Sequence, residues 1–345
     1  MYGPRRRRMP LGAVLALLLA ATLFAAPRHL SERTDRVPLA GGAGGRAFNP
    51  HRAYPSRVSW PQRGQAALVL GDGRPAASPN EQPTPIASLA KVMTAYLTLE
   101  RYPLSGVQNG FTITVTEEQA QVEGQGQSVV VVRAGEQLSE RQLLEALLIP
   151  SGNNIARMLA TDVAGSEARF LAEMNAEARA LGMSQTVYTD PSGFDPSTVS
   201  TAADQLRVFQ RAMRFPAFRQ IVAMSSVTLP VAGTLTNFNP LIAEGYAGKT
   251  GSDSAAGGCL AFFTHVTVGG HRLTAAGVVM GQGQGSDTSA LLAAAGDAAT
   301  QMVESVAPAI RVPTIAAPGA GGPSGGAGRQ GPALSLAPGR ASAQN

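Results

Sequence analysis

The stretch PIASLAKVMTAY, residues 85–96, places Ser88 and Lys91 three positions apart in a segment with helical spacing. Residues at positions i and i+3 share one face of a helix, so this hydroxyl and this amine can meet. A serine hydroxyl is a weak nucleophile until a base removes its proton. The stretch therefore predicts a nucleophilic serine whose base is Lys91, provided that the surroundings keep the amine neutral.

Lysine is scarce in this chain. Of its 28 basic residues, only Lys91 and Lys249 are lysines, and all the others are arginines. Arginine cannot act as a base in a protein, whereas lysine can be desolvated and deprotonated. Because arginine serves almost wherever a positive charge is needed, we expect both lysines to take part in chemistry.

Composition limits the class of protein. The chain has 345 residues, 44% of them hydrophobic, which suffices for one large domain or two small ones. Its single cysteine, Cys259, excludes an internal disulfide framework, and we expect a buried structural thiol there.

The net charge of +5 owes much to the arginines at positions 5–8, without which 24 basic residues face 23 acidic ones. Since no stripe of basic and aromatic residues follows, we predict no nucleic-acid partner.

The N-terminus has the pattern of an export signal. Four arginines precede an apolar run over residues 11–26, which is short for a membrane span of about twenty residues. Pro27 would block cleavage directly after Ala26, so residues 1–26 are predicted to be either a signal peptide or an uncleaved membrane anchor. Either one places the protein outside the cytoplasm, in the periplasm or cell envelope, with membrane contact only through this segment.

Two further segments lack the pattern of a folded domain. Residues 27–58 are rich in Arg, Gly and Pro and predict a linker. Residues 308–345 are rich in Ala, Gly and Pro and predict a disordered tail. The folded domain is therefore expected over residues 59–307.

Hydrophobic spacing within this domain predicts alternating strands and helices. Strands are expected at 65–70, 111–115, 129–132 and 227–231, and a hairpin with arms at 259–268 and 271–280. Helices are expected around Ser88 and at 140–149, 155–163, 167–181, 201–214 and 287–306. The order predicts an α/β (α+β) fold, in which an antiparallel sheet of N- and C-terminal strands packs against a mainly helical subdomain.

Two more polar motifs stand out from apolar surroundings, Ser151-Gly-Asn153 and Lys249-Thr-Gly251. By themselves, Ser151 or Asn153 could cap the following helix, and the second motif could be an ordinary entry to a strand. Together with Ser88 and Lys91, they match in order and separation the signature set of penicillin-binding proteins and β-lactamases.

The wider sequence resembles the low-molecular-mass D-alanyl-D-alanine carboxypeptidases, which are serine peptidases of the SxxK type. The resemblance covers residues 65–306 and is carried by four segments, at 86–96, 150–154, 188–195 and 248–260. It implies a β-lactamase/transpeptidase-like fold and a DD-carboxypeptidase catalytic domain at 59–307. Such an enzyme removes the terminal D-alanine from peptidoglycan pentapeptide stems through an acyl-enzyme, and β-lactams inhibit it.

The resemblance also implies the catalytic roles. Ser88 attacks the peptide carbonyl between the two terminal D-alanines, and Lys91 accepts its proton. A second cation at Lys249 would help to keep Lys91 neutral. Ser151, with its hydroxyl tied to Lys249, would pass the proton to the leaving amine.

The substrate-binding roles follow from the same resemblance. Asn153 would hold the substrate amide, and Lys249 and Thr250 would bind the terminal carboxylate. Gly251 would leave room for the substrate backbone. The backbone N–H groups of the nucleophile and of Ser252 would hold the oxyanion.

No cofactor is expected, and the histidines show no metal-ligand spacing. They are His29, His51, His265 and His271.

Two other functions are weighed against this one. A class A-like β-lactamase shares the three motifs but uses a glutamate in a loop after the second motif, and the loop at 189–201 contains none. An inactive cell-wall-binding scaffold would not need the intact Ser88 and Lys91. Endopeptidase or transpeptidase activity stays open, because all of these reactions share the acyl-enzyme.

Overall fold

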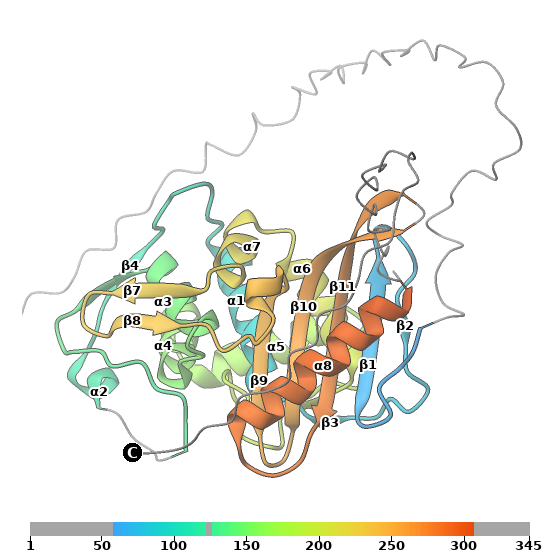
Figure 1. The fold of residues 1–345 in the computed structure, drawn as a ribbon. Helices are drawn as coiled ribbons and strands as arrows, with labels where there is room; N and C mark the ends of the chain where they lie inside the picture. Colours follow the sequence, from blue (N-terminus) through green and yellow to red (C-terminus); the bar gives the residue numbers. More distant parts are fainter. Residues whose placement is uncertain (1–57, 122–125, 269, 307–345) are drawn as a thin grey trace, which may run out of the picture. The chain divides into compact units, whose positions relative to one another are not determined.

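The computed structural model describes residues 58–121, 126–268 and 270–306 (Figure 1). The predicted leader and tail, and all but one residue of the predicted linker, lie outside the described residues. The chain divides into two units, 1–47 and 48–345, and every described residue belongs to the second. None of the described helices combines the length and apolar character that a membrane span requires.

A five-stranded antiparallel sheet joins the two ends of the described chain. Its strand order is β2-β1-β11-β10-β9, and Gln65 of β1 pairs with Met280 of β11. The sheet of N- and C-terminal strands predicted from the sequence is therefore confirmed. The strands are β1 (Gln65–Leu70), β2 (Ala76–Ala77), β9 (Ala247–Asp253), β10 (Gly257–Val268) and β11 (His271–Gln282).

Helices cover both faces of this sheet. All six residues of β1 are buried, as expected for an apolar run without polar alternation. Leu68 packs in one core cluster with Ala295 and Met302 of α8 (Thr288–Val306), which lies across one face (Figure 1). Val69 points to the opposite face and packs with the core of the helical block. β9 has β10 on one side only, so its other edge is available to the rest of the molecule.

The helical block is built around α1 (Lys91–Arg101). This helix contacts α3, α4, α5 and α6, and most of its residues are buried. Its N-terminus begins directly after the 3₁₀ helix η2 (Ala87–Ala90), which carries Ser88 and contacts β9. The other helices are α2 (Glu117–Ala120), α3 (Glu140–Leu148), α4 (Asn153–Ala164), α5 (Glu167–Ala180), α6 (Ala202–Ala212) and α7 (Pro216–Val222).

Three short ladders and one more turn of 3₁₀ helix complete the described secondary structure. The ladders pair β3 (Thr84–Pro85) with β6 (Val199–Ser200), β4 (Thr112–Thr114) with β5 (Gln137–Ser139), and β7 (Ser226–Leu229) with β8 (Gly233–Thr236). The 3₁₀ helix is η3 (Ile242–Glu244).

Most of the expected elements are present, and the single cysteine is buried as expected. The strand predicted at 129–132 is wrong, because this segment joins no ladder. The Asn154 side chain instead donates to the carbonyl of Val130 and accepts from its N–H. The short helix α7 and the strands β5 and β8 were not predicted.

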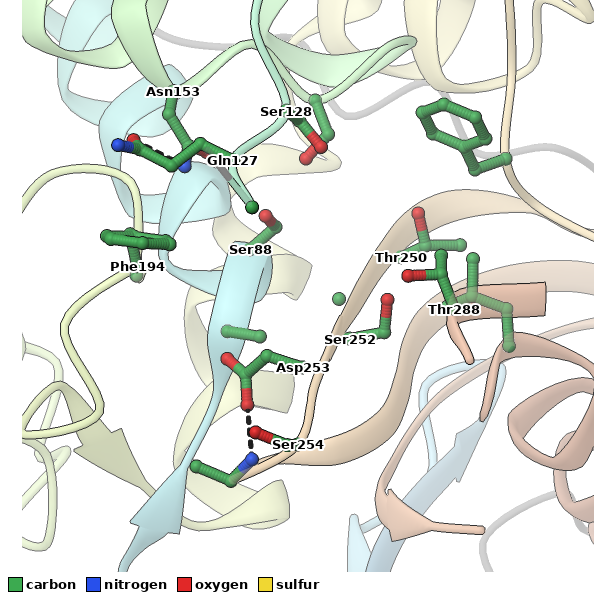
Figure 2. A pocket seen from close by; sticks show the side chains of 18 of the residues that line it. Ser88, Gln127, Ser128, Asn153, Phe194, Thr250, Ser252, Asp253, Ser254 and Thr288 are labelled. Carbon is green, nitrogen blue, oxygen red and sulfur yellow. Dashed lines mark hydrogen bonds between the residues drawn. The ribbon is translucent and has the colours of Figure 1, made fainter. Parts of the chain in front are cut away.

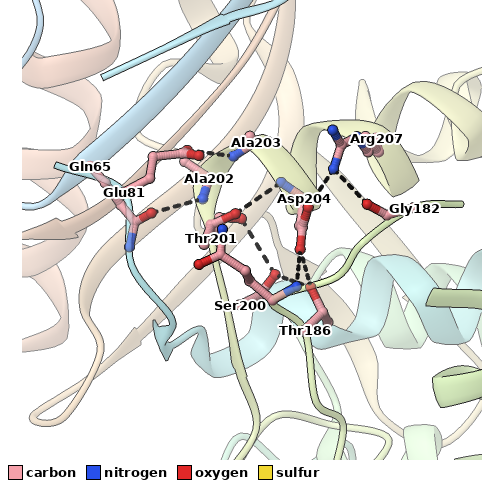
Figure 3. Close-up of polar contacts among 11 residues, drawn as sticks. Gln65, Glu81, Gly182, Thr186, Ser200, Thr201, Ala202, Ala203, Asp204 and Arg207 are labelled. Atoms are coloured by element: carbon pink, nitrogen blue, oxygen red, sulfur yellow. Dashed lines mark hydrogen bonds and ion pairs between the residues drawn. The ribbon is translucent and has the colours of Figure 1, made fainter. Parts of the chain in front are cut away.

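Side-chain oxygens accept hydrogen bonds from the backbone N–H groups at the start of α6 (Figure 3). The first turn of a helix has no intrahelical acceptors for these groups. Thr201 accepts from the N–H of Asp204, as a capping residue does. The carbonyl oxygen of the Gln65 side chain accepts from Ala202 at 3.0 Å, and Glu81 accepts from Ala203 at 2.7 Å. Strand β1 and the loop after β2 are thereby tied to the helix that packs on the sheet.

We expect the substitution Gln65→Leu to lower the free energy of unfolding by about 1–3 kcal/mol, because buried polar partners would lose their bonds. Besides accepting from Ala202, the Gln65 amide nitrogen donates to Gln82 O and Thr84 Oγ1. Urea denaturation would measure the loss. The control is Glu81→Gln, which keeps an acceptor oxygen and should change stability much less. Equal losses in the two variants would contradict this account.

Candidate active site

The three polar motifs, far apart in sequence, converge in one cleft (Figure 2). The 3₁₀ helix η2 supplies Ser88, the turn before α4 supplies Ser151, the first residue of α4 is Asn153, and β9 supplies Lys249 and Thr250. A chain of short contacts connects them. Lys91 Nζ lies 2.7 Å from Ser88 Oγ and 2.7 Å from Asn153 Oδ1, and Lys249 Nζ lies 2.9 Å from Ser151 Oγ.

The serine lies on a 3₁₀ turn rather than on the α-helix itself. In a 3₁₀ helix the side chains at i and i+3 are eclipsed, which aligns the serine with the lysine that begins α1. Ala87 adopts a positive φ of 45°, a conformation that is unfavourable for a residue with a Cβ. The strain indicates that surrounding structure fixes this turn.

Two glycines hold this turn from either side. Gly193 has a φ of 75°, and a Cβ on it would lie 1.8 Å from the carbonyl oxygen of Ala87. A Cβ on Gly251 would lie 3.1 Å from the nitrogens of Ser88 and Leu89 and 3.0 Å from Ile86 O. Gly251 therefore lets β9 approach the backbone of Ser88, a contact that the sequence did not predict.

Lys91 is fully buried and has three partners that suit a neutral amine. It donates to Asn153 Oδ1 and, at 3.0 Å, to the carbonyl of Ser192, and its third partner is the Ser88 hydroxyl. A neutral amine has two N–H donors and one lone pair, so the lone pair can face the hydroxyl. Burial holds the pKa of Lys91 well below its usual value, the charge of Lys249 lowers it further, and Asp190 opposes the shift.

Lys249 is also fully buried. Its Nζ donates to Ser151 Oγ and to the carbonyl of Thr250, each at 2.9 Å. Burial lowers the pKa of Lys249 to about 7. This amine therefore titrates near neutral pH, between a charged and an uncharged form.

The two residues of the second motif do not cap α4, which settles the alternative that the sequence left open. The N-cap position belongs to Gly152 and has no side-chain hydrogen bond. Ser151 has a φ of 65° and directs its hydroxyl to Lys249. The Asn153 side chain accepts from Lys91 and donates to Gln127 Oε1 at 3.3 Å.

A buried carboxylate shapes the wall opposite β9. Asp190 accepts through Oδ1 from the N–H groups of Ser192 and Gly193, and through Oδ2 from that of Asp195. These bonds set the turn that directs the Ser192 carbonyl to Lys91. Nothing in the sequence indicated that this turn contacts Lys91.

The cleft above these groups has a volume of about 700 Å³. The hydroxyls of Thr250 and Ser252 line one side, and Phe194 lies across from them with Ser88 between (Figure 2). Phe194 and Phe238 are exposed aromatic residues of the lining that the sequence did not single out. Among the described residues, Asp253 is the only acidic one that lines the cleft.

Two of the four histidines, His29 and His51, lie outside the described residues. Within the described ranges, no group of three or more His, Cys, Asp and Glu side chains could hold a metal ion.

Residues 76–284 match the model of peptidase family S11, the D-alanyl-D-alanine carboxypeptidases. The chain belongs to this family. A D-alanyl-D-alanine endopeptidase of Pseudomonas aeruginosa is 37% identical over 137 residues, which make up 39% of this chain and 42% of that protein. The D-alanyl-D-alanine carboxypeptidase DacB2 of Mycobacterium tuberculosis is 35% identical over 181 residues, 50% of this chain and 59% of that protein.

This S11 chain thus spans about half the length of the curated relatives that it matches. Its fold is similar to the crystal structure of a D-alanyl-D-alanine carboxypeptidase from M. tuberculosis, with a TM-score of 0.56 and 31% identity. That similarity covers 71% of this chain and 94% of the other. The predicted α/β fold, with its antiparallel sheet and helical subdomain, is confirmed.

We expect Gly251→Ala in this S11 chain to slow acylation of Ser88 by a penicillin by up to about tenfold, since a 1 Å shift at a reacting group can cost about 100-fold and this substitution would force a smaller one. The added Cβ would press on backbone atoms, which cannot rotate away. Labelling with a fluorescent penicillin would measure the rate.

Gly248→Ala is the comparison for this variant, because its Cβ would lie 2.0 Å from Ala261 O, between strands β9 and β10. That substitution should mainly lower the melting temperature. A Gly251→Ala chain that is acylated at the wild-type rate would show that the close approach of β9 does not position the nucleophile.

Proposed function

We propose that this chain is a serine-type D-Ala-D-Ala carboxypeptidase that removes the terminal D-alanine from peptidoglycan stem peptides through an acyl-enzyme on Ser88. The observation that carries the proposal is the 2.7 Å contact of Ser88 Oγ with Lys91 Nζ, an amine whose pKa burial holds well below its usual value. Membership of family S11 supports it. Penicillins would acylate the same hydroxyl.

In the acylation step, Ser88 Oγ attacks the carbonyl carbon of the penultimate D-alanine while Lys91 takes the hydroxyl proton. The carbonyl oxygen becomes an oxyanion, which the backbone N–H groups of Ser88 and Ser252 would hold. Each donor of this kind is typically worth roughly 3–4 kcal/mol in the transition state. Ser88 and Ser252 both line the cleft, on opposite sides of the space where the carbonyl would lie (Figure 2).

The leaving amine then needs a proton as the C–N bond breaks. Ser151 lines the cleft and accepts a hydrogen bond from Lys249, so its hydroxyl can donate a proton to the amine and recover one from the lysines. Water attacks the resulting ester, with Lys91 again taking the proton. The products are D-alanine and a peptide shortened by one residue.

The terminal carboxylate of the peptide would bind at the Lys249 end of the cleft. The Thr250 hydroxyl lines the cleft there, and the positive charge of a protonated Lys249 would attract the carboxylate. Asn153 would hold the amide of the substrate, since its side chain offers both a donor and an acceptor. Gly251 lines the cleft, and its lack of a side chain makes room for the backbone of η2.

This chemistry requires contact with the cell wall. The proposed location is therefore extracytoplasmic, reached through the export segment at residues 1–26. Peptidoglycan stems are the proposed partners and β-lactams the proposed inhibitors. No nucleic acid and no cofactor takes part in the proposed reaction.

A β-lactamase is less well supported. Rapid hydrolysis of the penicilloyl-enzyme in class A enzymes uses a glutamate, and among the described residues no glutamate lines this cleft. A scaffold without activity is also less well supported, because it has no need for a buried lysine in contact with a serine.

The test is to incubate the purified chain with a pentapeptide that ends in D-Ala-D-Ala and to identify the products by mass spectrometry. We expect release of one D-alanine, and a loss of at least about 1,000-fold for Ser88→Ala, because removing the nucleophile of a catalytic unit has effects of that size. Ser254→Ala, another serine of the cleft, is the matched control. Absence of D-alanine release, or rapid turnover of penicillin, would overturn the proposal.

The proposed role of Lys249 predicts a pH dependence. Below about pH 7 the amine is charged and attracts a carboxylate, and above that pH it becomes neutral. The ratio of the acylation rate with a penicillin to that with its methyl ester should therefore fall, by up to about tenfold per unit, as the pH rises above 7. Protonation of Lys91 changes both acylation rates by the same factor, so its effect cancels in their ratio. A ratio that is independent of pH would contradict the role.

A further inference from the structure

A second hollow opens beside the cleft, at its Ser254 end. It has a volume of about 380 Å³ and lies between Arg63, the turn after β9 and the loop at 281–285. Ser254 and Ala255 line both the hollow and the cleft, so the two spaces adjoin. Most of the other residues that line the hollow are glycines, so no large side chain blocks a peptide that extends into it from the cleft.

Arg63 supplies the positive charge of this hollow. The amide oxygen of Gln284, in the orientation that satisfies both groups, accepts from the two terminal guanidinium nitrogens at 2.8 and 2.9 Å. The carbonyl of Arg63 accepts from the buried Gln282 side chain at 2.7 Å, which fixes the backbone. Among the described residues, the ion pairs are Arg101 with Glu173 and Arg207 with Asp204. Arg63 is therefore an exposed cation in contact with Gln284, and no carboxylate of the described residues pairs with it.

The direction of the substrate follows from the proposed function, on which this inference rests. The terminal carboxylate lies toward Thr250, and the reacting carbonyl lies between Ser88 and Ser252. The preceding residues of an extended peptide must then run past Ser252 toward Ser254, the end of the cleft opposite Asn153 (Figure 2). With a rise of about 3.3 Å per residue, two or three residues bring the peptide to the hollow.

The charges along this path favour an anion in the hollow. Asp253 lines the cleft before the hollow begins, and its Oδ1 accepts from the N–H groups of Ala255 and Ala256, closing the turn. Among the described residues that line the hollow, Arg63 is the only charged one. A guanidinium has five N–H donors, so contact with Gln284 leaves donors for a further acceptor. Carboxylates are the planar anions that arginine binds best.

We propose that Arg63, supported by Gln284, forms a subsite for a carboxylate on the third or the second residue of the stem pentapeptide, one or two residues before the D-alanine that carries the reacting carbonyl. The subsite selects acidic stem peptides over neutral ones. It contributes to binding the part of the substrate that precedes the cleaved bond, and it takes no part in the chemistry at Ser88.

The test compares kcat/KM for D-alanine release from synthetic pentapeptides. Four peptides are compared. The first has a free carboxylate on its second residue only, and the second has one on its third residue only. The third peptide has free carboxylates on both residues, and the fourth has both carboxylates amidated. A charged hydrogen bond of this kind typically contributes enough to change affinity by tenfold or more. For Arg63→Gln we expect about a tenfold loss with the acidic peptides and less than a twofold loss with the amidated one. The two singly acidic peptides identify the carboxylate that binds.

Arg74→Gln is the matched control, because Arg74 is an exposed arginine at the opposite end of β1. It should leave every rate within twofold. Equal losses on acidic and amidated peptides, or equal effects of the two variants, would overturn the subsite while leaving the proposed function intact. Failure of the wild-type chain to release D-alanine from any peptide would overturn both.

Discussion

The burial of two lysine amines in one cleft is the constraint on which the rest of the structure depends. Lys91 and Lys249 are fully buried, and neither forms an ion pair within the described ranges. Charged amines in such positions would cost several kcal/mol each. Their partners are instead hydroxyls, an amide oxygen and backbone carbonyls. Burial thus favours the neutral amine, the form that can remove a proton.

The fold meets this constraint by fixing three distant segments against one another. The sheet joins the N- and C-terminal strands and places the edge strand β9 beside η2. The helix α1 crosses the centre of the helical block, so Lys91 at its start cannot move away from the cleft. Close backbone contacts at Gly193 and Gly251, together with the turn set by Asp190, leave the nucleophile little freedom.

Much of the arrangement could be predicted from the sequence, because the scarcity of lysine and the order of three motifs point to one site. Helical spacing located the long helices. The error at 129–132 has a physical cause. The β-branched residues of this segment favour an extended backbone, but a β-strand also needs a partner strand, and this segment has none. The contacts of Asp190, Gly193 and Gly251 with the nucleophile's surroundings depend on packing between distant segments, which no local pattern encodes. The Arg63 hollow was missed for the same reason.

The confinement of lysine to positions 91 and 249 has a practical consequence. Isotopic enrichment of lysine alone would place the label only on two buried side chains that contact residues of the cleft, and nowhere on the surface. Two side-chain nitrogen resonances would then report directly on the protonation of both amines. The same spectrum, recorded with an antibiotic bound, would follow the acyl-enzyme in the unaltered protein.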